Sequence, residues 1–537
     1  MLSSAHRAGA LTSVIGRLRA STALPALLAP MILLSPVAAK AEDQTPSRVF
    51  GDKVLTDGAD DIANSATVDL TQEVDFGGGE DLLTNTGVIT IGAKATGPVQ
   101  VSLTSLEALI NKGTIDMRNG HVGDTLTIAG DYGASKGRLG LDVGPSGADR
   151  LVVGDIANGD TVITLGVLSA KTAVLTGDKG PILIQAGVGS KENAFTIENY
   201  EIGLIHYGLV YDAATGAYRL KGVAGQRTYE ALKISEGASA VWRQSADAWS
   251  AHVASLRDAG STADGAAVWG QAYGGRQDRD DDIKVSSQRT VSADYAQTTY
   301  GGQMGVDLIN GDLGEEGRIL LGVTGGYADA RMRFSGVAGQ TVKLRVVNFG
   351  GYLALTRGDY FLNALAKVDR QSIKARNSVD AIDAKFDGAS FGGQIEAGSR
   401  TEDGGLAYEK LLSVNYVGTR LDDMETLGQR LDFGDTTGFV AKAGLRGSAQ
   451  NDLMGGALTT YGAAFVAHDF TVKNSLTLVS GDQSERISND GGRTFGQLTV
   501  GVSYRSGDGV ITFLEAGGDY GGGRQGGGLR FGARMGF

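Results

Sequence analysis

The last eleven residues, "GGLRFGARMGF" (527–537), alternate between apolar and polar side chains up to the end of the chain. The apolar set consists of Leu529, Phe531, Ala533, Met535 and Phe537, and the small or basic set of Arg530, Gly532, Arg534 and Gly536. Because successive side chains of a strand point to opposite faces, this pattern predicts a β-strand with one apolar and one polar face. Alternation alone suits both a soluble sheet and a strand between lipid and an aqueous lumen.

Eleven earlier segments have the same alternating character and are separated by turn residues. With the last one, the candidate strands are 267–274, 299–308, 318–330, 346–355, 360–368, 386–398, 406–417, 438–447, 458–467, 494–505, 510–520 and 527–537. Twelve is an even number, as single-chain outer-membrane barrels require. Most of the candidates are close to the ~9–11 residues that a membrane-spanning strand needs.

The distribution of proline divides the chain. All seven prolines lie at or before Pro181, and residues 182–537 contain none. Glycine, in contrast, is abundant, with 83 residues in the whole chain. A strand paired on both sides cannot spare an N–H group for proline, and a barrel in lipid must satisfy every backbone group internally. The exclusion of proline, the even strand count and the N-terminal export signal described next together favour a membrane barrel over a soluble sandwich.

The N-terminal residues predict export. Arg7, Arg17 and Arg19 precede the apolar run "TALPALLAPMILLSPVAA", and Ala39-Lys40-Ala41 has the A-x-A form of a cleavage site. We interpret residues 1–41 as a secretory signal peptide. A transmembrane helix is the alternative, and the prolines inside the run argue against it.

Composition narrows the function classes. The chain has no cysteine, so thiol chemistry is excluded and no disulfide supports the fold. A net charge of −12 and a pI near 5.0 argue against a nucleic-acid partner, which favours a basic face.

Three segments before residue 122 repeat one pattern. "DDIANSATVDL", "EDLLTNTGVITIG" and "EALINKGTIDM" each contain an acidic residue, an Asn and a following β-branched strand, with the asparagines at 64, 85 and 111. The spacings are 85 − 64 = 21 and 111 − 85 = 26 residues. A period of this length indicates a solenoid, and a parallel β-helix fits better than a leucine-rich repeat, whose leucine spacing is missing.

The next stretch, residues 122–165, resembles the last coils of autotransporter (type V secretion) passengers. The resemblance rests on Thr125-Leu126-Thr127-Ile128 with Gly130, the strand 139–143, and Asp149-Arg150-Leu151 followed by two valines. It implies an autochaperone-like segment that folds first outside the cell. The alternative is a simple cap that closes the solenoid.

Residues 229–258 predict a helix. The segment is rich in Ala, Ser and Glu and lacks proline, and Trp242, Trp249 and Leu256 recur on one stripe. Directly before a barrel, it resembles the helix that autotransporters thread through the pore. Family members that cleave themselves use an Asn in this helix, and this chain has no Asn between Asn199 and Asn310. We therefore expect a passenger that stays attached.

The resemblance gives a complete domain prediction. The fold class is all-β, with a parallel β-helix passenger, a linker α-helix and a 12-stranded antiparallel transmembrane β-barrel. The predicted parts are 1–41 signal peptide, 42–225 β-helical passenger, 226–262 α-helical linker in the barrel lumen, and 263–537 barrel. The terminal strand ending at Phe537 resembles the signal read by the barrel-assembly machinery. We expect outer-membrane lipid as a further partner, and a monomer in the cell outer membrane with its passenger at the surface.

The joins between strands predict three features. Long joins at 275–298, 369–385, 418–437 and 468–493 alternate with short ones, as in barrels with long outer loops. "DRDDD" (278–282) is interpreted as a solvated loop, with a divalent-cation site as the alternative, and "GGGRQGGG" (521–528) as a flexible loop rather than a phosphate-binding one. Arg357-Gly358-Asp359 matches the sequence of a cell-adhesion motif. Its position in a four-residue join instead predicts a tight hairpin turn on the periplasmic side.

No catalytic constellation is visible. The five histidines are scattered, and no metal-ligand spacing, serine nucleophile elbow or Walker loop is present. We predict no catalytic, cofactor-binding or metal residues and no cofactor. The leading hypothesis is an autotransporter, not an enzyme, that displays an adhesion or surface-contact module with an unknown ligand. The alternatives are a carbohydrate-active β-helix enzyme and a barrel that acts mainly as a pore.

Overall fold

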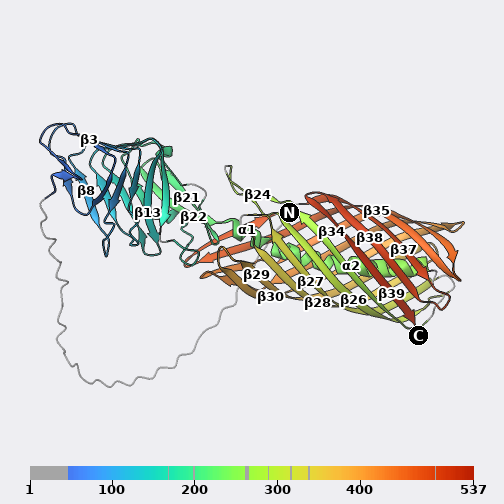
Figure 1. The fold of residues 1–537 in the computed structure, drawn as a ribbon. Helices are drawn as coiled ribbons and strands as arrows, with labels where there is room; N and C mark the ends of the chain where they lie inside the picture. Colours follow the sequence, from blue (N-terminus) through green and yellow to red (C-terminus); the bar gives the residue numbers. More distant parts are fainter. Residues whose placement is uncertain are drawn as a thin grey trace, which may run out of the picture. The chain divides into compact units, whose positions relative to one another are not determined.

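The computed structural model describes residues 46–166, 168–197, 200–259, 265–287, 289–314, 317–336, 339–489 and 492–537. These residues contain a β-solenoid, two helices and a closed β-barrel, so the predicted fold class is confirmed (Figure 1). The predicted signal peptide, residues 1–41, lies outside the described residues.

Three parallel sheets build the solenoid, which makes about four turns over residues 61–166. The first sheet contains β3 (Asp61–Asn64), β6 (Leu82–Asn85), β9 (Ala108–Asn111), β12 (Asp131–Ala134) and β16 (Ala157–Asn158). The second contains β4 (Thr67–Leu70), β7 (Val88–Ile91), β10 (Thr114–Asp116), β13 (Gly137–Gly144), β17 (Thr161–Gly166) and β19 (Phe195–Ile197), with β14 (Gly147–Ala148) paired to β13. The third contains β5 (Val74–Asp75), β8 (Gln100–Thr104), β11 (Thr125–Ile128), β15 (Arg150–Val153) and β18 (Ile182–Gln185).

Antiparallel strands close both ends of the solenoid. At the C-terminal end, β22 (Ala217–Ala224), β21 (Ile205–Asp212) and β20 (Tyr200–Ile202) extend the third sheet beyond β18. At the N-terminal end, β1 (Val49–Phe50) and β2 (Lys53–Val54) form a hairpin whose Phe50 is buried in the apolar core. Short 3₁₀ turns occur at Gly177–Lys179 and Glu192–Ala194.

The repeated asparagines form a ladder inside the solenoid. The amide nitrogen of Asn64 donates to the side-chain oxygen of Asn85, and that of Asn85 donates to Asn111, each at 2.9 Å. The amide of Asn111 continues the ladder by donating to the hydroxyl of Tyr132 at 3.2 Å. Buried amides need such partners, so the spacings of 21 and 26 residues mark stacked coils. The solenoid prediction from these three positions is confirmed.

Three buried carboxylates connect the later coils. Asp149 accepts backbone N–H groups of Gly123 and Asp124 at 3.0 Å and of Asp142 at 2.6 Å. Burial, with the nearby charges of Asp124 and Asp142, raises the pKa of Asp149 from 3.8 to about 7 despite these donors. Burial also raises the pKa values of Asp124 and Asp142.

These carboxyls make solenoid stability depend on pH. Their pKa values are higher in the folded chain, so between pH 3.8 and about 7 the folded state holds more protons than the unfolded state. Stability is therefore greatest at the acidic end of that window and declines as the pH rises through it. We expect Asp149→Asn to flatten this profile, measured by urea-dependent pulse proteolysis of residues 46–225 in the full chain.

The exposed Asp155, on the same coil, provides the control, and Asp155→Asn should leave the pH profile of the wild type intact. Stability that rises with pH across the window, or a profile that Asp149→Asn does not alter, would contradict the assignment.

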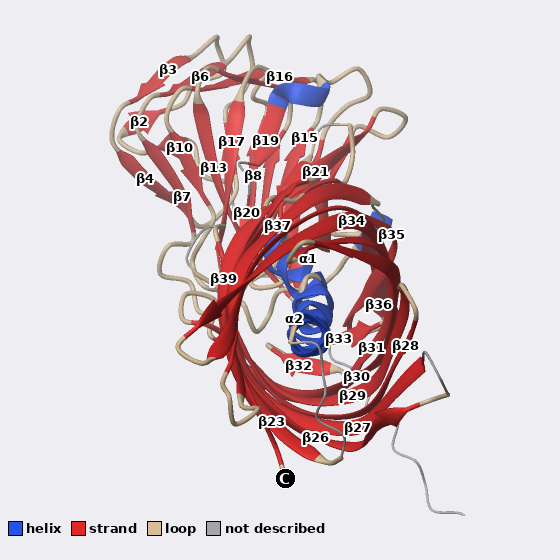
Figure 2. Ribbon diagram, turned by 90° about the vertical axis from the view of Figure 1, so that its right-hand side faces the viewer, coloured by secondary structure: helices blue, strands red, loops and turns tan. Residues whose placement is uncertain are grey.

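Twelve antiparallel strands in the described residues form the barrel. They are β23 (Ala267–Arg279), β26 (Tyr295–Asp312), β27 (Gly317–Phe334), β28 (Thr341–Arg357), β29 (Tyr360–Asn377), β30 (Ile382–Asp403), β31 (Leu406–Leu421), β34 (Thr436–Leu453), β35 (Gly456–Ser480), β37 (Arg493–Arg505), β38 (Ile511–Gly521) and β39 (Arg524–Gly536). β23 pairs with β39 along its whole length, which closes the ring (Figure 2).

The outward face of the barrel is apolar and its inward face polar. Leu529, Phe531 and Met535 are more than half exposed, whereas Arg534 is only 2% exposed. The tenth strand behaves alike, with Leu498 and Val500 outward. A ring of exposed large apolar side chains is unsuitable for water and suits lipid. The predicted faces of the last strand are confirmed.

The strands are longer than predicted, and two predicted loops are wrong. Strand lengths reach 25 residues in β35, because lumen-facing and outward-facing residues keep alternating through the expected loops. Only residues 378–381 join β29 to β30, so the long loop at 369–385 does not exist. The run "GGGRQGGG" is also mostly strand, since Gly522 and Gly523 form the turn and β39 begins at Arg524.

Short strands occupy other predicted loops. β24 (Asp282–Lys284) and β25 (Thr290–Ser292) form a hairpin within the join 280–294. β32 (Met424–Thr426) and β33 (Gln429–Phe433) form another, and β33 pairs with the extended end of β35. β36 (Gln483–Asn489) folds back on that same end of β35.

The Arg-Gly-Asp tripeptide is a turn, as predicted. β28 ends at Arg357 and β29 begins at Tyr360, and Gly358 has a φ of +53°, which glycine adopts without strain. The strand pairings put this turn at the end of the barrel where β23 begins and β39 ends. Its assignment to the periplasmic side stays a prediction.

Candidate functional site: the helix-filled lumen

Helix α2 (Ile234–Asp258) lies inside the ring of barrel strands and follows a short helix, α1 (Gln226–Leu232) (Figure 2). The predicted helix 229–258 is therefore confirmed, with a break at Lys233. At about 1.5 Å per residue, the 25 residues of α2 span roughly 37 Å, more than the roughly 30 Å hydrocarbon core of a bilayer. Frequent Ala and Ser residues keep the helix slim enough for the lumen.

The predicted aromatic stripe packs against the wall. Trp242, Trp249 and Leu256 are buried in one apolar cluster with strand residues that include Trp269, Tyr352 and Val417. The indole N–H of Trp242 donates to the backbone oxygen of Lys367 at 3.2 Å. Such aromatic packing fixes the rotation of α2 about its axis.

His252 joins the helix to the first and last strands. Its imidazole stacks on Trp269 of β23 at 4.3 Å, and its Nε2 lies 3.6 Å from Oδ1 of Asp307. Asp307 also receives Nε–H of Arg534 at 2.7 Å and the hydroxyl of Tyr352 at 2.6 Å. His252 thus contacts β23 directly and is linked to β39 through Asp307 of β26.

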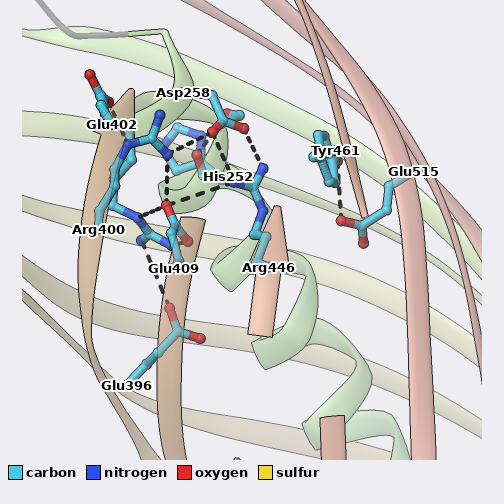
Figure 3. A network of polar contacts seen from close by, with 11 residues as sticks. His252, Asp258, Glu396, Arg400, Glu402, Glu409, Arg446, Tyr461 and Glu515 are labelled. Atoms are coloured by element: carbon cyan, nitrogen blue, oxygen red, sulfur yellow. Dashed lines mark hydrogen bonds and ion pairs between the residues drawn. The ribbon is translucent and has the colours of Figure 1, made fainter. Parts of the chain in front are cut away.

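A charged cluster holds the C-terminal end of α2 (Figure 3). Asp258 pairs with Arg400 of β30 at 3.1 Å and with Arg446 of β34. Arg257 pairs with Glu409 of β31 at 3.1 Å, and Glu409 also binds Arg400 at 2.8 Å. All five side chains are at least 85% buried, so each charge depends on its partners.

A second charged cluster holds the N-terminal end of α2. Lys233, which is fully buried, pairs with Glu236 at 2.9 Å and with Asp281. Asp281 also binds Arg493 of β37 at 2.7 Å. The prediction that "DRDDD" is a solvated loop is therefore wrong for Asp281, because the cationic end of the helix draws this carboxylate inward.

Hydrogen bonds connect the solenoid to barrel hairpins. The amide of Gln429 in β33 donates to the backbone oxygen of Ala173, and the N–H of Ala224 donates to Glu485 of β36, both at 2.6 Å. Arg289 donates to the backbone oxygen of Ala224 at 3.0 Å and pairs with Glu201 at 3.3 Å. Apolar residues of the solenoid and of these hairpins form one continuous cluster.

Within the described residues, no group of three or more His, Asp or Glu side chains could hold a metal ion. The sequence predicted no catalytic, cofactor-binding or metal-ligating residue, so there is none to locate in the structure. Across the same residues, no helix is long and apolar enough to cross a membrane.

Sequence reasoning missed the ionic clusters. The alternation rule had put Arg534 in the lumen, but it could not pair it with Asp307, which lies 227 residues earlier. Asp258, Arg400, Glu409 and Arg446 were not singled out at all. For Arg400, Glu409 and Arg446, the available signal is a charged side chain at a lumen-facing strand position, where burial is costly unless an opposite charge is present.

We expect Asp258→Asn to loosen α2 in the barrel. The substitution removes the anion shared by Arg400 and Arg446, and breaking a buried pair costs about 3–5 kcal/mol. Denaturation of the purified full chain in urea, followed by heat-modified gel mobility, measures the loss.

The control is Asp435→Asn, which breaks an exposed pair with Arg420 and should cost about 0–1 kcal/mol. Equal losses for the two variants would show that the cluster does not hold the helix.

Comparison with known proteins addresses the barrel. Residues 268–517 match the family model described as the autotransporter beta-domain. No curated protein matches the chain.

Solved structures with similar folds include three autotransporter domains. The beta domain of the Bordetella autotransporter BrkA has 20% identity and a TM-score of 0.41, covering 51% of this chain and 100% of that one. The transport unit of AIDA-I from Escherichia coli has 14% identity and a TM-score of 0.41, covering 50% and 90%. The translocator domain of NalP from Neisseria meningitidis has 14% identity and a TM-score of 0.41, covering 57% and 99%.

The family match falls on the strands whose lumen holds α2, from β23 into β38. Residues 268–517 of this chain are therefore an autotransporter β-domain.

Proposed function

We propose that the barrel exports the segment 42–225 and retains it at the cell surface as an adhesion or surface-contact module. The observation that carries this proposal is the path of α2, which lies in the lumen and leads through α1 to the solenoid. A chain that ends its export with a helix in the pore leaves its N-terminal part on the far side of the membrane. The autotransporter β-domain locates the protein in the outer membrane.

Retention of the passenger follows from two features. The chain has no Asn from residue 200 to residue 309, so the linker offers no asparagine for self-cleavage. The lumen clusters of Asp258 and Lys233 hold the helix at both ends, and the hairpin contacts hold the base of the solenoid. The passenger therefore remains covalently tethered.

A binding role is favoured over catalysis in the passenger. Autotransporter translocator domains are generally not catalytic, and the solenoid must supply any enzyme activity. Its carboxylate cluster of Asp124, Asp142 and Asp149 is buried and accepts backbone N–H groups. Carboxylates that are engaged in this way are not free to act as general acid and base on a glycosidic bond. This argues against a carbohydrate-active site built from these three carboxylates.

The expected partners follow from the same surfaces. The outward apolar face suits outer-membrane lipid, and β39, which ends at Gly536 just before Phe537, is the segment proposed to engage the barrel-assembly machinery. We further propose that coils 122–165 act as the folding nucleus of the passenger, since their buried carboxylates connect successive turns. The surface ligand is unidentified, no nucleic-acid partner is proposed, and the functional unit is a monomer.

Protease treatment of intact cells tests the export proposal. We expect peptides from the solenoid to be released into the medium, while the barrel strands and α2 stay protected. Mass spectrometry identifies both sets, and a periplasmic protein serves as the control for cell integrity. A solenoid that stays protected in intact cells but is cut after the outer membrane is opened would contradict surface display.

The same preparation tests retention. Without protease, an immunoblot against the solenoid should detect one full-length species after signal removal. A free passenger of shorter length in the medium would contradict a tether.

A further inference from the structure

A cavity with many charged and polar side chains in its lining separates one side of α2 from the barrel wall. Its volume is about 140 Å³, and it lies between the helix and strands that include β23, β34, β38 and β39. The wall is thin here, because Gly517, Gly526 and Gly528 stand at lumen positions. At about 30 Å³ per water molecule, the space exceeds what one ordered water would fill.

Most charges that line this cavity are paired at short range. Lys442 binds Asp247 of α2 at 2.9 Å, and Arg530 binds Glu515 at 2.5 Å. Within each pair, the two opposite charges neutralise one another. They leave two arginines of the lining, Arg243 from α2 and Arg524 from β39, with only distant partners.

The two arginines are under-compensated. Arg243 lies 3.8 Å from Asp469, and Arg524 lies 3.9 Å from Asp519, both too far for a direct hydrogen bond. The Nε atoms of both side chains have no hydrogen-bond partner among the described residues. The side chain of Arg524 is 92% buried, since its exposed fraction is 8%.

Arg524 is also held in place against repulsion. Its guanidinium stacks on the ring of Phe495 at 4.2 Å, and the positive charges of Arg243 and Arg279 act on it. Buried like charges are costly unless an anion offsets them. The wall thus keeps a fixed, poorly compensated cation that faces another cation on the helix.

We propose that this cavity binds a small tetrahedral oxyanion, with the chemistry of inorganic phosphate, between Arg243 and Arg524. Planar guanidinium groups bind such anions through paired N–H donors, and each charge-assisted hydrogen bond is about twice as strong as a neutral one. The bound anion ties the plug helix to β39, a strand that closes the ring. The anion thereby adds a contact between α2 and the wall on the side of α2 opposite its aromatic packing.

A second, smaller cavity lies nearer the N-terminal end of α2. This second cavity, of about 30 Å³, shares Arg243 with the first and is also lined by Glu236, Arg279 and Arg493. Most of its lining side chains are charged or polar, which suits a hydrated ion and not an apolar ligand.

Isothermal titration of the detergent-purified full chain with inorganic phosphate, in phosphate-free buffer, tests the proposal. We expect saturable binding of one phosphate per chain, weakened at least tenfold in Arg524→Gln and in Arg243→Gln. Arg420→Gln is the matched control, because it removes an exposed arginine outside the lumen and should bind as the wild type does. Absence of saturable binding in the wild type, or unchanged affinity in Arg524→Gln, overturns the proposal.

A second pair of variants keeps both arginines. Gly517→Leu adds a side chain at a lumen position, where a new Cβ lies 3.3 Å from the nearest atom, the backbone oxygen of Leu498. Gly496→Leu makes the same change on the outward face, with the nearest atom at 3.8 Å. Filling the cavity should abolish phosphate binding, whereas the outward change should not. Heat-modified gel mobility confirms that each variant is folded, and undiminished binding in folded Gly517→Leu excludes this cavity as the site.

Discussion

The pairing of β23 with β39 is the constraint on which the rest of the molecule depends. Thirteen successive residue pairs, from Ala267 with Gly536 to Arg279 with Arg524, join the first strand to the last. Because lipid offers no partner to a backbone N–H or C=O group, a membrane wall with an unpaired edge is unstable. Closure removes both edges, accounts for the absence of proline from the barrel strands, and creates a polar lumen that α2 fills.

The helix and the lumen wall lower the cost of burying each other's polar and charged groups. Inward residues such as Glu409 and Asp307 would be costly as buried, unpaired charges, and α2 supplies Arg257 and His252 beside them. The wall in turn supplies packing surfaces and ion-pair partners to α2, which has few long apolar side chains of its own. Tryptophans fix its rotation and ionic clusters fix both of its ends, so α2 serves as plug and tether.

The pattern-based part of the fold was accessible from sequence, and the pairings were not. Alternation identified all twelve strands and the two faces of β39, because the side-chain period of a strand is local information. The Asn spacing identified stacked coils, since one residue type recurred at one position of each turn. Strand ends were set too short, since β29 and β30 continue through a stretch that looks like a polar loop. The partner of Asp258 lies 188 residues away in Arg446, and no local pattern encodes that distance.

Plugging and tethering both require that α2 occupies the lumen in the mature protein. The hydroxyls of Ser239 and Thr419 lie 3.0 Å apart, and the chain has no native cysteine. Ser239→Cys with Thr419→Cys should therefore form a disulfide in isolated outer membranes under mild oxidation, seen as a mobility shift that reductant reverses. Ser239→Cys with Ser413→Cys is the matched control, because Ser413 is buried on the same strand six residues away, roughly 20 Å at a strand's rise. Efficient crosslinking of the first pair alone is the predicted result, and its absence, or equal crosslinking of both pairs, would contradict a helix held in the pore.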